Sequence, residues 1–223
     1  MKIFVAIPTY DGTLPIEVVR CLMDEQIAAV AGGDEITTMF LPGCSLITMG
    51  RNALADSFLK SDCDRLVFVD ADISWKMGDL VKLAKMKQDV VAGAYRYKRE
   101  KEGYPIRFMP DVKAIHEEEP GLVEVLFAPT GFMAINKSVF QRMREHEPNR
   151  VYSHDGMKHY CFFENPYTEG QFIGEDVWFC KRWREIGGHV FVAHEITLTH
   201  HQGQQKFTGN LGEWLQKGEW KNG

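Results

Sequence analysis

The residues best suited to chemistry in this 223-residue chain follow one apolar run. Leu66 to Val69 is unbroken and rich in β-branched and aromatic residues, which predicts a strand buried on both faces. The run stops at Asp70-Ala71-Asp72, and carboxylates two positions apart point the same way in an extended chain. Open α/β sheets bind ligands at the carboxyl ends of their strands, and oxygen ligands suit Mg²⁺ or Mn²⁺. The pattern therefore predicts a divalent-cation site, with a solvated turn as the alternative interpretation.

Two further groups of acidic or imidazole side chains lie later in the chain. Glu175 and Asp176 stand at the predicted start of a helix, where the helix dipole favours carboxylates even without a function. An Asp here could act as a base on an acceptor hydroxyl, because neighbouring phosphates would raise a pKa that the dipole lowers. His200 and His201 follow a predicted strand, and neutral imidazole is a good metal ligand. Adjacent residues of an extended segment face opposite ways, so we expect at most one of them to reach a metal.

A zinc hydrolase is an alternative interpretation of the histidines. The candidate ligands would be His194-Glu195 with His200-His201, or His154-Asp155 with His159. Neither group has the H-E-x-x-H spacing on a helix that puts two imidazoles on one face. The sequence therefore favours the acidic site over a zinc site.

The elements that must position these groups alternate along the first part of the chain. Apolar runs predict strands at 2–7, 36–41, 66–69 and 89–94. Three helices are predicted between them: one capped by Thr13 and ended by Gly32-Gly33, one entered through Arg51-Asn52, and one at 79–86. The first carries an apolar stripe at Val18, Val19, Leu22, Met23, Ile27 and Val30. This alternation predicts an α/β fold with a mostly parallel sheet and helices on both faces.

The second part of the chain predicts mixed or antiparallel strands added to this sheet. The expected strands are 106–109, 112–115, 122–127, 130–135, 189–193 and 196–199, and the expected helices are 137–144 and 175–186. Residues 148–169 are expected to be an aromatic loop, and the tail from Gly203 either folds over a site or frays. No composition break indicates a domain boundary.

Composition excludes several classes of protein. A chain with 44% hydrophobic and 26% charged residues can bury one sizeable core, and a net charge of -5 argues against charge-driven nucleic-acid binding. No signal-peptide pattern is present, and no apolar run approaches the ~20 residues that cross a bilayer. We therefore expect a cytoplasmic protein without a membrane span. The five cysteines form no C-x-x-C and are expected to be free thiols.

Six motifs in order resemble the GT-A class of nucleotide-sugar glycosyltransferases, in particular small phage-type and bacterial members of the family-2-like group. They are IPTYDG at 7–12, SLITMGRN at 45–52, DAD at 70–72, APTGFMAINKSVF at 128–140, GEDVWFCKRW at 174–183 and HHQG at 200–203. The resemblance covers roughly residues 2–210. It implies one GT-A domain over 1–223, with a Rossmann-like nucleotide-binding half (about 1–95), an acceptor-side half (about 96–210) and a tail (204–223).

The resemblance also implies roles for individual residues. Asp72 would be the main metal ligand, with Asp70 nearer the ribose and metal as a second ligand. His201, rather than His200, fits the H-x-G spacing as the third ligand, although the sequence leaves open which of the two histidines binds the metal. Asp176 would be the base and Glu175 its neighbour. The residues implied to contact the donor are Pro8, Thr9, Tyr10, Asp11, Arg51, Asp70, Ala71, Asp72, Thr130 and Gly131. Arg51 would bond phosphate or a carbonyl as a fixed cation.

The expected function is transfer of a sugar from a UDP- or GDP-sugar to a hydroxyl acceptor with Mn²⁺ or Mg²⁺. The sequence leaves the acceptor open: some short phage-type relatives glycosylate hydroxymethylated DNA pyrimidines, and others act on saccharides or proteins. A basic stretch from Arg96 to Lys101 with nearby tyrosines would suit DNA, but Glu100 and Glu102 interrupt it and favour a solvated loop. A sugar-nucleotide pyrophosphorylase and an inactive nucleotide-sugar-binding module are the alternatives. The sugar, the base, the stereochemistry and the oligomeric state are left open by the sequence.

Overall fold

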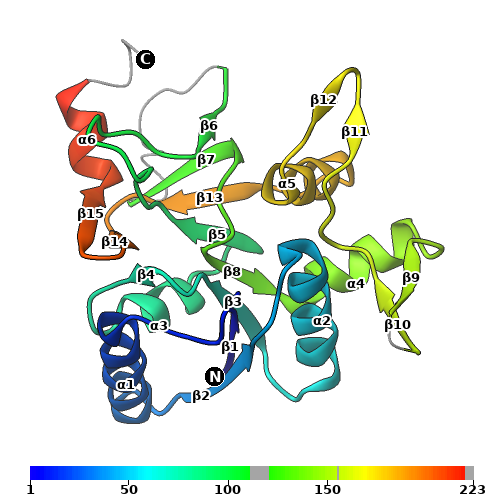
Figure 1. Cartoon of the computed structure of the whole chain (residues 1–223), viewed down its shortest axis with the longest axis horizontal. Helices are drawn as coiled ribbons and strands as arrows, with labels where there is room; N and C mark the ends of the chain where they lie inside the picture. The colour runs from blue at the N-terminus through cyan, green and yellow to red at the C-terminus, as the bar shows by residue number, and fades with distance from the viewer. Residues whose placement is uncertain (111–120, 155, 219–223) are drawn as a thin grey trace.

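The centre of the fold is one sheet. The computed structural model describes residues 1–110, 121–154 and 156–218, and within them eight strands form this sheet. In spatial order they are β2 (Glu35–Leu41), β1 (Lys2–Pro8), β3 (Arg65–Val69), β8 (Phe132–Asn136), β5 (Val90–Gly93), β13 (Val190–Ala193), β7 (Leu122–Phe127) and β6 (Arg107–Phe108) (Figure 1). The pairings make β7 and β8 antiparallel to the other six. The predicted α/β class with a mostly parallel sheet and a mixed extension is confirmed.

The strands predicted from apolar runs in the first part of the chain all form. β1 pairs in parallel with β2 and β3, and every residue of β3 is buried, as a central strand requires. The neighbour of β3 on its other side is β8, which comes from the second part of the chain and separates β3 from β5. The two parts of the chain therefore share one sheet, an insertion that local sequence patterns did not predict.

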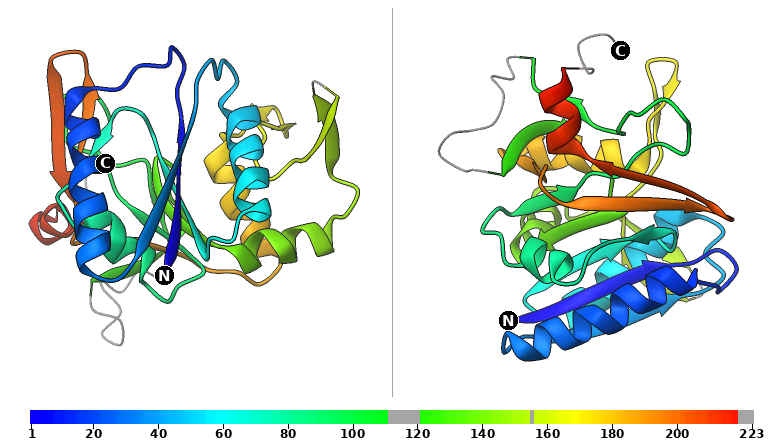
Figure 2. Two further views of the ribbon diagram at one scale, coloured as in Figure 1. Left: turned by 90° about the horizontal axis from the view of Figure 1, so that it is seen from below. Right: turned by 90° about the vertical axis from the view of Figure 1, so that its left-hand side faces the viewer.

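Helices cover both faces of this sheet (Figure 2). The described helices are α1 (Ile16–Ala31), α2 (Ile47–Lys60), α3 (Asp79–Ala84), α4 (Lys137–His146), α5 (Glu175–Glu185) and α6 (Leu211–Lys217). Alternate residues of β1 point to opposite faces, so Ile3 and Val5 pack with α1 and α3 while Phe4 and Ala6 pack with α2, α4 and α5. Each face thus has its own apolar core.

Smaller sheets complete the second part of the chain. A three-stranded sheet contains β4 (Ile73–Ser74), β14 (Thr197–Gln202) and β15 (Gln205–Asn210). Two hairpins, β9 (Val151–His154) with β10 (Met157–Tyr160) and β11 (Tyr167–Thr168) with β12 (Gln171–Phe172), lie where a loop was expected. Of the two alternatives left for the tail, fraying does not hold for residues 205–217, because β15 pairs along all of β14 and α6 follows it. The strand expected at 112–115 lies outside the described residues.

The first helix faces the core differently from the prediction. Met23, Ile27 and Val30 are exposed, and Glu25 is among the residues buried instead. The Glu25 carboxylate accepts bonds from the Trp75 indole (3.0 Å) and from the backbone N–H of Leu80 (3.1 Å), which satisfy a buried acid. Burial raises the pKa of Glu25 despite these bonds.

The start of this helix also differs from the prediction. Thr13 does not cap it: the N-cap is Pro15, and Thr13 bonds to Asp11 Oδ1 instead.

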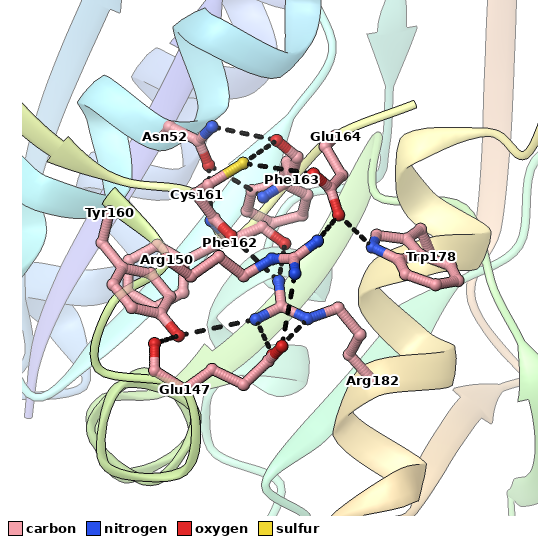
Figure 3. A network of polar contacts seen from close by, with 10 residues as sticks. All are labelled: Asn52, Glu147, Arg150, Tyr160, Cys161, Phe162, Phe163, Glu164, Trp178 and Arg182. Carbon is pink, nitrogen blue, oxygen red and sulfur yellow. Dashed lines mark hydrogen bonds and ion pairs between the residues drawn. The ribbon is translucent and has the colours of Figure 1, made fainter. Parts of the chain in front are cut away.

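A polar network, here called the Arg182 network, ties α4 and the segment after it to α5 (Figure 3). Arg182 donates to Glu147 Oε2 from Nε at 2.8 Å and to the carbonyl of Cys161 at 2.9 Å. Arg150 bridges Glu147 and Glu164, and the Trp178 indole donates to Glu164. These contacts fix α5, the helix whose first residues are Glu175 and Asp176.

Two further expectations concern the cysteines and the membrane. All five cysteines are free thiols, as expected, and Cys21, Cys63 and Cys180 are buried. Within the described parts of the chain, no helix has both the length and the apolar character that crossing a bilayer demands.

Candidate active site

Segments far apart in the sequence meet at the carboxyl edge of the central sheet. They are the loops after β1, β3 and β5, the first turns of α2 and α5, and strand β14. Together they form an open cleft of about 480 Å³. The lining residues are Pro8, Tyr10, Asp11, Thr13, Pro15, Ile47, Arg51, Asp70, Ala71, Asp72, Tyr95, Glu175 and His200. The cleft therefore includes most of the predicted site residues, whereas Thr9, Thr130, Gly131, Asp176 and His201 are not among its lining residues.

Arg51 joins two of the acidic groups. Its side chain is only 4% exposed, and it donates to Asp70 Oδ1 at 2.8 Å and to Glu175 Oε1 at 2.6 Å. Burial alone would lower the pKa of Arg51, but the charges of Asp70 and Glu175 outweigh it and keep the guanidinium protonated. One buried cation thus holds the end of β3, 19 residues after it, against the start of α5, 124 residues after it.

Asp72 lies on the other side of the cleft. Its Oδ2 is 2.5 Å from Nζ of Lys98 and 3.4 Å from Nε2 of His200. Burial tends to raise the pKa of Asp72, but hydrogen bonds from His200, when both of its ring nitrogens carry protons, and from Lys98 outweigh it and lower the pKa to about 2. The carboxylate is therefore ionised at neutral pH and available to a cation.

The structure places His200, not His201, beside the acidic pair. The expected strand ended at Thr199, but β14 continues to Gln202, so the two histidines alternate across it. His201 is 4% exposed, and its Nε2 lies 2.7 Å from the Ser74 hydroxyl. Burial lowers the pKa of His201, as expected for a neutral core histidine. The expected third ligand, His201, thus packs behind the cleft, and His200 takes its place in the lining.

Asp176 is an acid beside the cleft whose pKa is raised. Burial and then the neighbouring charge of Glu175 raise its pKa. Its Oδ1 accepts a bond from the backbone N–H of Val177 at 2.7 Å. Glu175, in contrast, lines the cleft and is paired with Arg51. The two adjacent acids therefore have different environments, one paired and one with a raised pKa.

The loop before β8 passes close beneath Asp70. The Asp70 backbone N–H bonds the Gly131 carbonyl at 2.9 Å, and a Cβ on Gly131 would lie 2.4 Å from Asp70 Oδ2 and 2.7 Å from the Tyr95 hydroxyl. No larger residue fits there without displacing one of them. The hydroxyls of Thr9 and Thr130 are buried and have no partner within the described residues. These features agree with a loop that must approach a ligand closely.

A divalent cation fits this arrangement only with help from a ligand. Among the described residues, no three His, Cys, Asp or Glu side chains converge to hold a metal alone. His200 Nδ1 donates to the Arg96 carbonyl at 2.8 Å, which leaves Nε2 facing Asp72 Oδ2. One carboxylate and one imidazole nitrogen suit Mn²⁺ or Mg²⁺ whose other positions are filled by phosphate and water.

One lining residue of the cleft, Tyr95, and one residue beside it, Lys98, were missed as site residues. Lys98 and Tyr95 belong to the basic, tyrosine-containing stretch that was interpreted as a solvated loop. Tyr95 is 9% exposed, and its ring packs 5.0 Å from that of His200. The signal that would have found them is position: they follow β5, whose carboxyl end meets the same edge as that of β3.

Glycosyltransferases are among the solved structures that share features of this fold. Residues 1–349 of S. aureus TarS match with a TM-score of 0.48 and 12% identity, covering 93% of this chain and 60% of that chain. A mutant of Drosophila beta-1,4-galactosyltransferase 7 in complex with manganese, UDP-Gal and xylobiose matches with a TM-score of 0.48 and 12% identity. The match covers 93% of this chain and 70% of that chain. TarS 1–349 in complex with UDP-GlcNAc matches with a TM-score of 0.46 and 12% identity, covering 93% of this chain and 58% of that chain. No protein-family model and no curated protein matches the chain.

Proposed function

We propose that this chain is a metal-dependent glycosyltransferase that moves a sugar from a nucleoside-diphosphate sugar to a hydroxyl acceptor. The observation that carries the proposal is the convergence of Asp70, Asp72, Glu175 and His200 in one cleft at the carboxyl edge of the sheet. This edge is where open α/β sheets bind nucleotides. An excess of carboxylates there suits a substrate that arrives with a divalent cation.

The donor half of the proposed site lies along β1 and β3. Tyr10 and Asp11 are exposed at the cleft and are suited to a base and a ribose. Asp72 and His200 would hold Mn²⁺ or Mg²⁺, which as a Lewis acid stabilises the charge that develops on the leaving diphosphate. Arg51 fixes Asp70 in place through its bond at 2.8 Å.

Asp176 is the proposed base. Its raised pKa suits proton abstraction near neutral pH better than that of an ordinary Asp. The acceptor hydroxyl gives its proton to the Asp176 carboxylate as its oxygen bonds the sugar carbon and the bond to the diphosphate breaks. Glu175 stays paired with Arg51 and keeps the start of α5 at the cleft.

A saccharide is the acceptor class that we favour over a DNA base. The cleft is lined by four carboxylates, from Asp11, Asp70, Asp72 and Glu175, and the chain carries a net charge of -5. Phosphates of a nucleic acid would be repelled by this surface, whereas an uncharged sugar would not.

The test is thermal unfolding of the purified protein with a panel of UDP- and GDP-sugars, with Mn²⁺ and with chelator. A ligand that binds only the folded protein raises the midpoint by mass action. We expect a metal-dependent rise with one donor and its loss in Asp72→Asn. Asp62→Asn, at a 77% exposed carboxylate paired with Lys2, is the matched control and should respond like the wild type. No rise with any nucleotide sugar would contradict the proposal.

A further inference from the structure

Lys98 reaches the cleft from the segment that follows β5. Its Nζ lies 2.5 Å from Asp72 Oδ2, and the two side chains are 30% and 35% exposed. The other cation of the cleft, Arg51, is 4% exposed and is held between two acids. Lys98 is therefore the cation that a ligand can displace.

The backbone on either side of Lys98 is anchored independently of Asp72. Before it, the Tyr97 N–H donates to the Gly103 carbonyl at 2.9 Å, and after it, the Arg99 N–H donates to the Tyr97 carbonyl at 2.8 Å. The lysine stem is long and flexible, and its ammonium group can rotate among partners. The ammonium can thus leave Asp72 without a change in the fold of the segment.

The protonation of the two His200 ring nitrogens explains why a positive charge is needed beside Asp72. A carbonyl only accepts hydrogen bonds, so Nδ1 of His200, which bonds the Arg96 carbonyl, carries the proton. In the neutral ring the lone pair is then on Nε2, 3.4 Å from the Asp72 oxygen. Two electron-rich atoms face each other, and Lys98 provides the positive charge beside them. A metal ion bound by Asp72 and His200 would need the position that the Lys98 ammonium group occupies.

We propose that Lys98 is an exchangeable counter-ion of the donor site: it holds Asp72 in the free protein, gives way to the divalent cation, and then pairs with the donor diphosphate. This inference deepens the proposed function and rests on it. Two cations at one carboxylate oxygen repel each other, so Lys98 and the metal exclude one another. The diphosphate gives the displaced ammonium a new partner. The metal therefore binds weakly alone and more tightly with a nucleoside diphosphate, by reciprocal coupling.

The test measures binding of Mn²⁺ by electron paramagnetic resonance, with and without UDP, for wild type and Lys98→Gln. We expect Lys98→Gln to bind Mn²⁺ alone about tenfold tighter and UDP in the presence of Mn²⁺ about tenfold weaker, within the usual range of coupling between sites. The control is Lys101→Gln, which removes the same charge from an exposed lysine of the same segment and should bind like the wild type. Lys98→Arg keeps the charge and should retain the coupling.

Each result decides the proposal. Unchanged or weaker Mn²⁺ binding by folded Lys98→Gln overturns the exchange. UDP binding without any Mn²⁺ binding, in wild type and in all variants, also overturns it, because Lys98 would then replace the metal permanently. If Lys98→Gln does not fold, loss of the coupling in Lys98→Arg would equally contradict it. Failure of the proposed function is distinct: wild type would bind no nucleotide, while the Mn²⁺ titrations would still show whether Lys98 competes for Asp72.

Discussion

Arg51 in the cleft and Arg182 in the Arg182 network have similar burial and the same kind of partner. Their side chains are 4% and 3% exposed, and each donates to carboxylate oxygens. Each also joins segments distant in the sequence, since Arg51 reaches Glu175 and Arg182 reaches Glu147. Judged by a single contact, both would be structural ion pairs.

The charge around each arginine differs. In the Arg182 network two glutamates, Glu147 and Glu164, face two arginines, and the Trp178 indole is a further donor to Glu164 (Figure 3). Its charges balance without any ligand. Such a network stabilises one arrangement of the chain.

The cleft has more acids than fixed cations. Among the described residues, five carboxylates lie at or next to it, whereas its one fixed cation is Arg51 and Lys98 is the exchangeable one; the acids are Asp11, Asp70, Asp72, Glu175 and Asp176. Uncompensated negative charge at a partly buried site costs free energy until a cation binds. The charge balance of the whole group, rather than burial of one arginine, distinguishes a binding site from a structural network.

The largest expected effect on stability is in the balanced network. Arg182→Met should lower the free energy of unfolding by about 3 kcal/mol, because it leaves Glu147 without its main partner and removes a donor to the Cys161 carbonyl. Urea denaturation measures the loss. Nucleotide affinity of the folded fraction should be unchanged. A large loss of affinity at unchanged stability would contradict a purely structural role for the Arg182 network.

Removal of one charged partner in the cleft should reduce activity rather than stability. Asp72→Asn should reduce turnover of the donor by about a hundredfold or more, since it removes charge stabilisation at the leaving diphosphate. Its effect on the free energy of unfolding should stay below about 1 kcal/mol, because the ion pair with Lys98 is partly exposed. Steady-state kinetics and urea denaturation on the same sample separate the two. Full turnover by folded Asp72→Asn would contradict the assignment.

The two adjacent histidines of β14 allow metal binding and stability to be tested separately within one strand. His200→Ala should weaken Mn²⁺ binding with UDP by about tenfold or more, because an imidazole ligand is lost. His201→Ala should leave this affinity unchanged and instead lower stability by about 1 kcal/mol, because the Ser74 hydroxyl loses its buried partner. Titration with Mn²⁺ and thermal unfolding measure the two effects. The reverse pattern would restore His201 as the ligand.

The smallest expected effect is a shift in pH dependence. Asp176 is active when deprotonated, so its raised pKa makes turnover fall as pH decreases, at a higher pH than for an ordinary Asp. Glu175→Gln removes a like charge and should move this acid limb to lower pH.

The same raised pKa has a consequence for stability. It means that the folded state binds the Asp176 proton more readily than the unfolded state, so stability falls as pH rises from the ordinary to the raised value. Asp176→Asn should therefore be more stable than wild type at neutral pH while losing activity. A pH-rate profile and thermal unfolding at several pH values check both, and equal or lower stability of Asp176→Asn would contradict the burial argument.

The sequence predicted the parts of the molecule that local patterns determine. The apolar runs of β1 and β3 and the carboxylates at the end of β3 were placed correctly, because a strand buried on both faces admits few other residues. The position of β8 between β3 and β5 was not predictable, since strand order depends on packing of distant segments. The inward face of α1 was wrong because Glu25 is buried through bonds from Trp75 and Leu80, which tertiary structure alone supplies.

The site residues show the same limit. Arg51, Asp70, Asp72 and Glu175 were brought together as the motifs implied. The choice between His200 and His201 depended on the pairing register of β14 with β4, because a shift by one residue exchanges the two faces. Lys98 was missed because a flexible side chain in a charged loop has no local pattern that indicates its partner.

The contact of Arg51 with Glu175 also has a consequence for how the chain folds. Its partners are 19 and 124 residues away, and β8 must enter between β3 and β5 before the sheet is complete. Contacts of such large sequence separation form slowly because the loop must close first. During refolding we therefore expect helical signal to recover before nucleotide binding. A fragment ending near residue 95 would contain the D-x-D motif and still lack the cleft.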